Sequence, residues 1–174
     1  MTEGAQARVA VVCATDAHVP DIVRLVGELR AQEDLPAAIS AESVRAYLAE
    51  AQTEVLVALA PDRAREGRDD TGAGHEAPGS ESSGEVVGLL TLRIIGDLFH
   101  DGTSAMVQEL IVDAEWRGLG VGGALLDAAA ELARERGCAE IGVSTGIQNP
   151  DAQAVYRSRG FETDSLWFEL HFEG

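Results

Sequence analysis

The sequence predicts an α/β protein, an α+β sandwich in which a mixed, mostly antiparallel sheet carries helices on both faces. Three observations support this fold class. β-Branched apolar runs of strand length recur along the chain, segments with apolar residues three or four positions apart lie between them, and turn chemistry joins two long runs as a hairpin. The expected order is β-α-α-β-β-β-α-β-α-β.

Six segments have the composition of strands. Val, Ile and Leu are frequent in five of them, and in the sixth, at the end of the chain, large apolar residues occupy every second position as in a half-buried strand. Asp101 and Gly102 supply the turn that makes the third and fourth strands a hairpin. The expected strands are residues 8–14, 53–60, 85–96, 104–112, 140–145 and 165–172.

Four segments have helical periodicity, and their ends carry recognisable signals. Ser40 is a good N-cap for the second helix, and Gly137 is a natural stop after the third. Asn149 caps the fourth, Pro150 takes its first position, and Gly160 ends it. The expected helices are residues 21–30, 41–51, 121–137 and, with both caps included, 149–160.

Residues 61–84 interrupt this pattern. They are charged, rich in Gly and Ser, and contain no Val, Leu, Ile or Met, so they cannot bury enough apolar surface to offset the entropy of ordering them. We expect a flexible insertion loop between two strands of a single domain that spans residues 1–174, because a length of 174 residues favours one domain.

The charge balance narrows the classes of partner. The chain has 13 basic and 30 acidic residues, a formal net charge of −17. This excess of acid argues against a nucleic-acid partner, which needs clustered Lys and Arg, and it is compatible with a cationic substrate. The charge also serves solubility.

The remaining composition argues against metals, disulfides and membranes. Cys13 and Cys138 lie far apart in apolar surroundings, so we expect two reduced, buried thiols, and the four histidines show no ligand spacing, so no metal is expected. The apolar runs are too short to span a bilayer, and the N-terminus lacks the pattern of a signal peptide. We therefore expect a cytoplasmic protein with no membrane partner.

The stretch RGLGVGG, residues 117–123, matches two different nucleotide-binding patterns. From Gly118 it is G-x-G-x-x-G, the fingerprint of a dinucleotide-binding loop and of a nicotinamide-dependent oxidoreductase. From Arg117 it is R-x-x-G-x-G, a loop that can hold the pyrophosphate of coenzyme A. In both, glycines let backbone N–H groups approach an anion at a helix N-terminus.

The surrounding sequence favours the second pattern. A dinucleotide loop directly follows a strand and opens a βαβ unit, with an acidic residue about 20 positions on at the end of the next strand. Here DAEWR separates the strand from the first glycine, and Glu140 lies at the start of the next strand, not at its end. The preceding strand returns from a hairpin, and no second βαβ unit follows.

The segments QELIVDAEWRGLGVGGALL and NPDAQAVYRSRGF resemble the GNAT superfamily of acyl-coenzyme A-dependent N-acetyltransferases. By motif the resemblance covers residues 104–161, and by element order it covers nearly the whole chain. It implies the GNAT fold, with central strands that splay apart, and an enzyme that moves acetyl from acetyl-coenzyme A as co-substrate, without a metal, to a primary amine of a small molecule or a peptide.

The resemblance also assigns the residues that bind the co-substrate. Backbone N–H groups of the glycine loop are expected to cradle the pyrophosphate, and the exposed backbone of the preceding strand is expected to pair with the pantetheine arm as an added strand would. Asn149 matches a family asparagine near the pantetheine, although its capping role explains it equally well. The expected co-substrate-binding residues are Leu110, Ile111, Val112, Arg117, Gly118, Leu119, Gly120, Val121, Gly122, Asn149 and Tyr156.

Two catalytic residues follow from the same resemblance. Tyr156 matches the family tyrosine whose hydroxyl faces the thioester sulfur and can protonate the leaving thiolate. Glu109 is the candidate base that takes a proton from the attacking amine, with a solvated or substrate-binding carboxylate as the alternative. Some relatives carry a glutamate on the next strand where this chain has Ser144. A backbone N–H near Leu110 or Ile111 is expected to polarise the thioester carbonyl.

Other functions on the same fold stay open at this point. A GNAT-like domain can sense acyl-coenzyme A, or offer a partner surface, without turnover. Homodimers are common in the superfamily, but the sequence indicates no interface. Asp97, His100, Asp101 and Trp167 are candidates for an amine pocket, and a turn and an edge strand explain them as well.

Overall fold

The computed structural model describes residues 8–32, 35, 38–61, 84–163, 168 and 170. The predicted insertion loop lies almost wholly outside these residues, as does the strand predicted over residues 165–172 apart from two positions. Trp167, a candidate for the amine pocket, also lies outside them.

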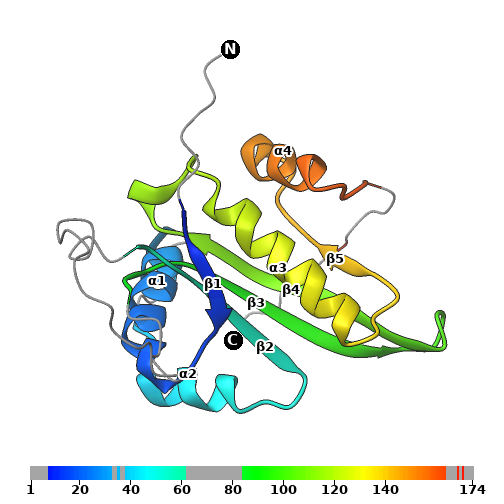
Figure 1. Ribbon diagram of the computed structural model, residues 1–174, viewed down its shortest axis with the longest axis horizontal. Helices are drawn as coiled ribbons and strands as arrows, with labels where there is room; N and C mark the ends of the chain where they lie inside the picture. The colour runs from blue at the N-terminus through cyan, green and yellow to red at the C-terminus, as the bar shows by residue number, and fades with distance from the viewer. Residues whose placement is uncertain are drawn as a thin grey trace, which may run out of the picture.

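The described strands form one five-stranded sheet in which sequence neighbours pair in order from β1 to β5. The first four strands run antiparallel to one another, and β4 and β5 are parallel. The long β3–β4 hairpin projects beyond the rest of the sheet (Figure 1). The strands are β1 (Ala10–Cys13), β2 (Thr53–Leu59), β3 (Val86–Asp97), β4 (Gly102–Val112) and β5 (Ile141–Val143).

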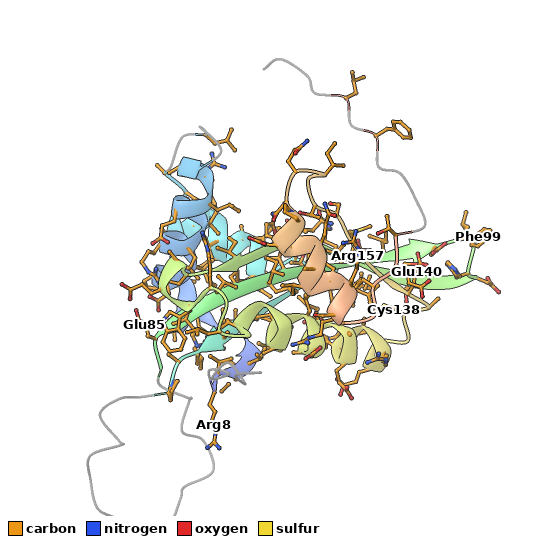
Figure 2. The ribbon with its side chains drawn as sticks, turned by 90° about the horizontal axis from the view of Figure 1, so that it is seen from above. Arg8, Glu85, Phe99, Cys138, Glu140 and Arg157 are labelled. Atoms are coloured by element: carbon orange, nitrogen blue, oxygen red, sulfur yellow. The ribbon has the colours of Figure 1, made fainter. Side chains whose placement is uncertain are left out.

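Helices cover both faces of this sheet, as predicted (Figures 1 and 2). On one face lie α1 (Val19–Gln32) and α2 (Ala41–Leu48). On the other, α3 (Val121–Glu135) packs along the sheet, and α4 (Pro150–Ser158) packs beside α3. Short 3-10 turns precede α1 and α3: η1 (Asp16–His18) and η2 (Ala114–Trp116).

Two apolar cores result, one on each side of the sheet. The α3 core gathers the apolar stripe of α3, with Val121, Leu125 and Ala129 almost fully buried against the sheet. The core under α1 and α2 gathers a separate set of aliphatic side chains. Burial of these aliphatic side chains is the main force that holds helices and sheet together. The buried members of the second core are Val19, Ile22, Leu25, Val44, Val55, Val57, Leu59, Val86, Leu89 and Ile111.

A bulge at Gln108 divides β4 into two parts with opposite facing. Along the ladder, Thr91 of β3 pairs with Glu109 and Leu92 pairs with Val107, so Gln108 is left over. The extra residue shifts the alternation of the strand. Before the bulge, Val107 belongs to the α3 core, whereas after it Ile111 belongs to the core under α1 and α2. Glu109 therefore shares the α1–α2 face with Ile111.

The sheet splays between its two parallel strands. β5 pairs with β4 only over residues 105–107, opposite residues 141–143. Among the described residues, no strand pairs with the rest of β4, residues 108–112, on that side. The predicted splay of the central strands is therefore present, and it leaves one backbone edge of β4 open next to the start of α3.

The helix caps predicted at Ser40 and Asn149 are confirmed, and the first three helices differ in their bounds from the prediction, with the first ending at Gln32 and the third at Glu135. Ser40 Oγ accepts a hydrogen bond from the Ser43 N–H at 3.0 Å, and Asn149 Oδ1 accepts one from the Ala152 N–H at 3.1 Å. The first helix begins at Val19 rather than residue 21, because the η1 turn leads directly into it. The second ends at Leu48 rather than residue 51, where a turn enters β2.

One cysteine differs from expectation. Cys138 is half-buried, but Cys13 is exposed, because it ends the edge strand β1, which only β2 flanks among the described strands. The apolar residues around Cys13 in the sequence predicted that it is buried. Its exposure is instead decided by the position of its strand at the edge of the sheet.

Arg24 of α1 ties that helix to the ends of β3 and β4. Its guanidinium donates to Asp113 at 2.8 Å, to the Val86 carbonyl at 2.9 Å and to Glu28 at 3.1 Å. Burial acts to raise the pKa of Asp113, but hydrogen bonds from Arg24 and from the Glu115 N–H outweigh it and lower the pKa. The residue that follows β4 is thus held as a carboxylate against α1.

Gly88 of β3 sets how closely α3 approaches the sheet. A Cβ at this position would lie 3.0 Å from both Leu125 Cδ1 and Val121 Cγ1 and 3.4 Å from the Ala58 Cβ. Val121 is the first residue of α3, so a side chain here would push against the beginning of that helix. The absence of a side chain at Gly88 lets the glycine loop sit close to the end of β4.

Gly88→Ala is expected to lower the free energy of unfolding by about 1–3 kcal/mol, because the added methyl overpacks the α3 core. Gly96→Ala on the same strand is the matched control, since its Cβ would meet nothing within 4 Å. Urea unfolding followed by circular dichroism measures both. Equal midpoints for the two variants would contradict the role assigned to Gly88.

Candidate active site

The glycine loop between η2 and α3 has the backbone of an anion cradle. Gly118 has φ +74° and Gly120 has φ +88°, a left-handed region that favours glycine. Gly120 is the N-cap of α3 and offers no side chain to the helix end, so the first N–H groups of α3 have no side-chain cap. Backbone N–H groups and the positive end of the helix dipole converge here.

The side chain of Arg117 fastens this loop to β4. Its Nε donates to the Val112 carbonyl, the last of the strand, at 3.0 Å. The conformation brings the start of the loop back to the end of the open strand edge. Leu119, between the two left-handed glycines, is exposed. The structure therefore brings together the predicted loop residues and the predicted strand residues.

Gly123 is the last glycine of the dinucleotide pattern, and the structural reason for a glycine there differs from that at Gly118 and Gly120. A Cβ there would lie 2.1 Å from a guanidinium nitrogen of Arg159, at the end of α4. The Arg159 Nε is in turn paired with Asp127 of α3 at 3.0 Å. Gly123 lies inside α3, so it serves the contact between α3 and α4 and not the geometry of the loop.

The open edge of β4 lies between the loop and the bulge. Leu110 and Val112 pack against the α3 core, and Ile111 is buried in the core under α1 and α2. Their side chains are therefore structural, and what they can offer a ligand is backbone N–H and C=O along the splay. A ligand with amide groups can pair with such an edge as a strand does.

Glu109 lies at the bulge on the α1–α2 face. Its side chain is half-buried and accepts a hydrogen bond from the Thr91 hydroxyl, whose oxygen also accepts from the Glu109 N–H at 3.1 Å. Burial raises the pKa of Glu109 above its usual value of 4.5. A carboxylate with a raised pKa is better matched to proton abstraction near neutral pH than an exposed one.

Tyr156 lies on the opposite face. It comes from α4, packs against the α3 core, and has its ring centroid 6.1 Å from that of Phe161. Burial raises the pKa of Tyr156 above its usual value of 10.0, so at neutral pH the phenol is protonated and can donate a hydrogen bond. Its hydroxyl makes no hydrogen bond with another of the described residues.

The two predicted catalytic residues are therefore not in contact. Glu109 and Tyr156 lie on opposite faces of the sheet, Glu109 on the side of α1 and α2 and Tyr156 on the side of α3 and α4. Asn149 caps α4 with its Oδ1. This arrangement suits a ligand that passes through the splay with its reactive end between a carboxylate and a phenol.

A further group of polar residues gathers at the hairpin end, away from this site. His100 Nδ1 lies 2.6 Å from Asp97, which also accepts from the Ser104 hydroxyl, and Glu140 lies nearby. Figure 2 places Phe99 at the hairpin tip with Glu140 and Cys138 toward the same end, and Glu85 at the other end. The three potential metal-ligand atoms lie within 4.8 Å of one another, but the bonds of Asp97 already account for the turn.

Sequence reasoning missed two neighbours of Glu109. Thr91 faces it across the β3–β4 ladder, and Tyr47 reaches this point from α2. One signal for the bulge was available. Without it, the alternation of β4 would place Glu109 on the same face as Val107 and Ala105, among the aliphatic residues of the α3 core. An acidic residue at such a position indicates a break in register.

Membership of a known family distinguishes the dinucleotide pattern from the coenzyme A pattern in residues 117–123. Residues 41–161, more than half of the chain, match the acetyltransferase (GNAT) family. The chain belongs to the GNAT family. This confirms the resemblance stated from the two motifs, and it removes the basis for a dinucleotide-binding fold.

Curated GNAT relatives include enzymes with different acceptors. An aminoglycoside N(6')-acetyltransferase of Stenotrophomonas maltophilia is 32% identical over 97 residues, which are 53% of this chain and 63% of that protein. An aminoalkylphosphonate N-acetyltransferase of Salmonella typhimurium is 35% identical over 86 residues, which are 49% of this chain and 56% of that protein. The chain thus matches about three fifths of the length of each relative.

Solved structures confirm the GNAT fold. A transcriptional regulator from Bacillus halodurans superposes with a TM-score of 0.73 at 23% identity, over 95% of this chain and all of that one. An aminoglycoside acetyltransferase from an uncultured soil metagenomic sample, solved with sisomicin, superposes with a TM-score of 0.71 at 18% identity, over 95% and 97% of the two chains. In the described part of this GNAT chain, no helix has the length and apolar character needed to cross a membrane.

Proposed function

We propose that this protein is an N-acetyltransferase that moves acetyl from acetyl-coenzyme A to a primary amine by direct attack in a ternary complex. The observation that carries the proposal is a glycine loop suited to hold an anion next to the open edge of β4, with a half-buried carboxylate and a half-buried phenol on opposite faces of the sheet. Membership of the GNAT family supports it.

The residues fit acetyl-coenzyme A as follows. Backbone N–H groups from Arg117 to Gly122 hold the pyrophosphate, because two left-handed glycines and an uncapped helix start supply donors and positive potential there. The backbone of residues 110–112 pairs with the amides of the pantetheine arm. A backbone N–H of this edge polarises the thioester carbonyl as negative charge develops on its oxygen. Asn149 lies at the start of α4, beside the same arm.

The reaction requires a base and an acid. Glu109 takes a proton from the ammonium form of the acceptor, since only the neutral amine has the lone pair that attacks the carbonyl carbon. The new C–N bond forms as the thioester C=O bond opens. When the intermediate collapses, the C–S bond breaks and the sulfur leaves with the electron pair. The nitrogen, which carries one proton more than the amide product, loses that proton, and the proton passes to the thiolate by way of the Tyr156 hydroxyl, which hydrogen-bonds the leaving sulfur. Glu109 releases its own proton to solvent.

A small cationic amine is the proposed class of acceptor. The curated relatives carry names with two small-molecule amines, an aminoglycoside and an aminoalkylphosphonate. A net charge of −17 draws cations toward the surface of the protein. A cytoplasmic location and the absence of nucleic-acid and membrane partners stay predictions from the sequence, and a homodimer stays a possibility that the resemblance raises.

The experiment that tests the proposed function is a thiol-release assay with acetyl-coenzyme A and a panel of acceptors. The panel contains aminoglycosides, aminoalkylphosphonates, polyamines, amino acids and peptides with free N-termini. We expect release of coenzyme A with at least one cationic amine. Binding of acetyl-coenzyme A without thiol release for any acceptor would instead indicate a sensor on the same fold, and tight binding of NADH without acetyl-coenzyme A would contradict both.

Gly120→Ala is expected to weaken binding of acetyl-coenzyme A by about 10-fold or more, because a left-handed conformation costs a residue with a Cβ roughly 1–2 kcal/mol and the loop opens to avoid it. Gly137→Ala is the matched control, since Gly137 has φ +74° at the other end of α3. Both variants should lose similar stability in thermal unfolding. Calorimetry should show the loss of affinity for Gly120→Ala alone, and equal affinities would remove the loop from the binding site.

Tyr156→Phe is expected to lower kcat by about 100-fold, a common size for the loss of a general acid, while KM for acetyl-coenzyme A stays within about 3-fold. The substitution removes only the hydroxyl, so the packing of the ring on Phe161 and the α3 core is kept. Steady-state kinetics with the acceptor found in the panel measure both constants. An unchanged kcat would eliminate Tyr156 as the acid.

A further inference from the structure

A cluster of hydroxyl groups surrounds the carboxylate of Glu109 on the α1–α2 face. Thr91 lies directly opposite Glu109 in the β3–β4 ladder, and only 5% of its surface is exposed. Tyr47 approaches from α2 and is part of the apolar packing over this face. The Tyr47 side chain forms a hydrogen bond with Thr91, and the charge of Glu109 acts on it.

The hydroxyl of Thr91 makes two hydrogen bonds with Glu109. Its oxygen accepts from the Glu109 N–H at 3.1 Å, and its proton is directed at Oε2 of the Glu109 carboxylate. A threonine hydroxyl can donate one hydrogen bond and accept two, so the bond to Glu109 uses the one proton that Thr91 has. The Tyr47 side chain lies within hydrogen-bonding reach of the same hydroxyl.

This arrangement leaves the two carboxylate oxygens of Glu109 with different surroundings. Oε2 is bound by Thr91, whereas Oε1 has no hydrogen-bond partner among the described residues. We propose that Thr91, itself held by Tyr47, is a positioning residue that binds one oxygen of Glu109 so that the other faces the acceptor amine. The inference rests on the proposed function, because it assigns to Glu109 the role of base.

No charged group near the cluster binds the Glu109 carboxylate in place of Thr91, among the residues that the structure describes. Arg93 of β3 and Glu50 after α2 lie near it, and they are paired with each other at 3.6 Å. No salt bridge joins Glu109 to a cation in the described part of the chain. Burial raises the pKa of Glu109, and a hydrogen bond donated to the ionised form opposes that effect. The hydrogen bond from Thr91 therefore favours the ionised form of Glu109, the form that can act as a base.

Thr91→Val, which keeps the shape and removes the hydroxyl, is the test. We expect the pKa of Glu109 to rise further, by about one unit, in a carbon NMR titration of the side-chain carboxyl groups, with Glu109→Gln used to identify its signal. The acidic limb of kcat against pH should move upward by the same amount, because Glu109 must be ionised to act. Thr91→Ser should restore the original limb and pKa.

Two controls separate positioning from general damage. Thr103→Val removes a hydroxyl from β4 that contacts Cys138, away from the cluster, and should leave the pKa of Glu109 unchanged. In the Glu109→Gln background, Thr91→Val should cause no further loss of kcat. A Glu109 pKa that is the same in Thr91→Val as in the wild type, or an equal loss of kcat with and without Glu109, would overturn the inference.

Different results would contradict the role of Glu109 as base and the role of Thr91 as its positioning residue. If Glu109→Gln keeps both the rate and the acidic limb, the base assignment of the proposed function is wrong. The carboxyl titration is independent of turnover, so it reports the contact between Thr91 and Glu109 in either case. A titration that shifts in Thr91→Val and returns in Thr91→Ser supports the contact, and one that does not shift refutes it.

Discussion

The geometry of the candidate active site depends on one extra residue in β4. A strand with regular alternation would place Glu109 on the side of Val107, inside the α3 core, where an ionised carboxylate would lack partners. The bulge at Gln108 turns the strand so that Glu109 faces α1 and α2, and leaves the backbone beyond it to diverge from β5. The facing of the carboxylate thus follows from the register of the β3–β4 ladder, and the open edge of β4 begins at the same residue.

The position of the glycine loop depends on a second constraint, the close approach of α3 to the sheet. Gly88 has no side chain to hold off the beginning of the helix, and the Arg117 guanidinium fixes the loop to the last carbonyl of β4. Asp113, between the strand and the loop, is held by Arg24 of α1. The helix on one face and the anion cradle at the edge are therefore anchored to the same end of the same strand.

Much of the fold could be predicted from local signals. The caps at Ser40 and Asn149 are specified by a single side chain and the N–H three residues on, and both form as expected. The strand segments and the order of elements follow from composition and periodicity. The exposure of Cys13 could not be predicted in this way, because it depends on which strand lies at the sheet edge.

The site was predictable only in part, for a related reason. The glycine loop is a contiguous pattern, and its motif context indicated coenzyme A. The neighbours of Glu109, by contrast, come from distant parts of the sequence. Thr91 lies 18 positions away in β3, and Tyr47 lies in α2. The register that places Thr91 opposite Glu109 depends on the bulge. The one sign of this arrangement in the sequence is an acidic residue, Glu109, at an apolar position of an alternating strand.

The three glycines of the G-x-G-x-x-G pattern have different evolutionary freedom. Gly118 and Gly120 are required by their own positive φ angles, so a residue with a Cβ would be strained there whatever its neighbours are. At Gly123 the Cβ position is occupied by the guanidinium of Arg159, the far end of a flexible side chain that can shift at little cost. Gly123 is therefore free to vary once Arg159 turns aside or is replaced by a shorter side chain. A dinucleotide fingerprint can thus arise, and disappear, in a family that never used the dinucleotide.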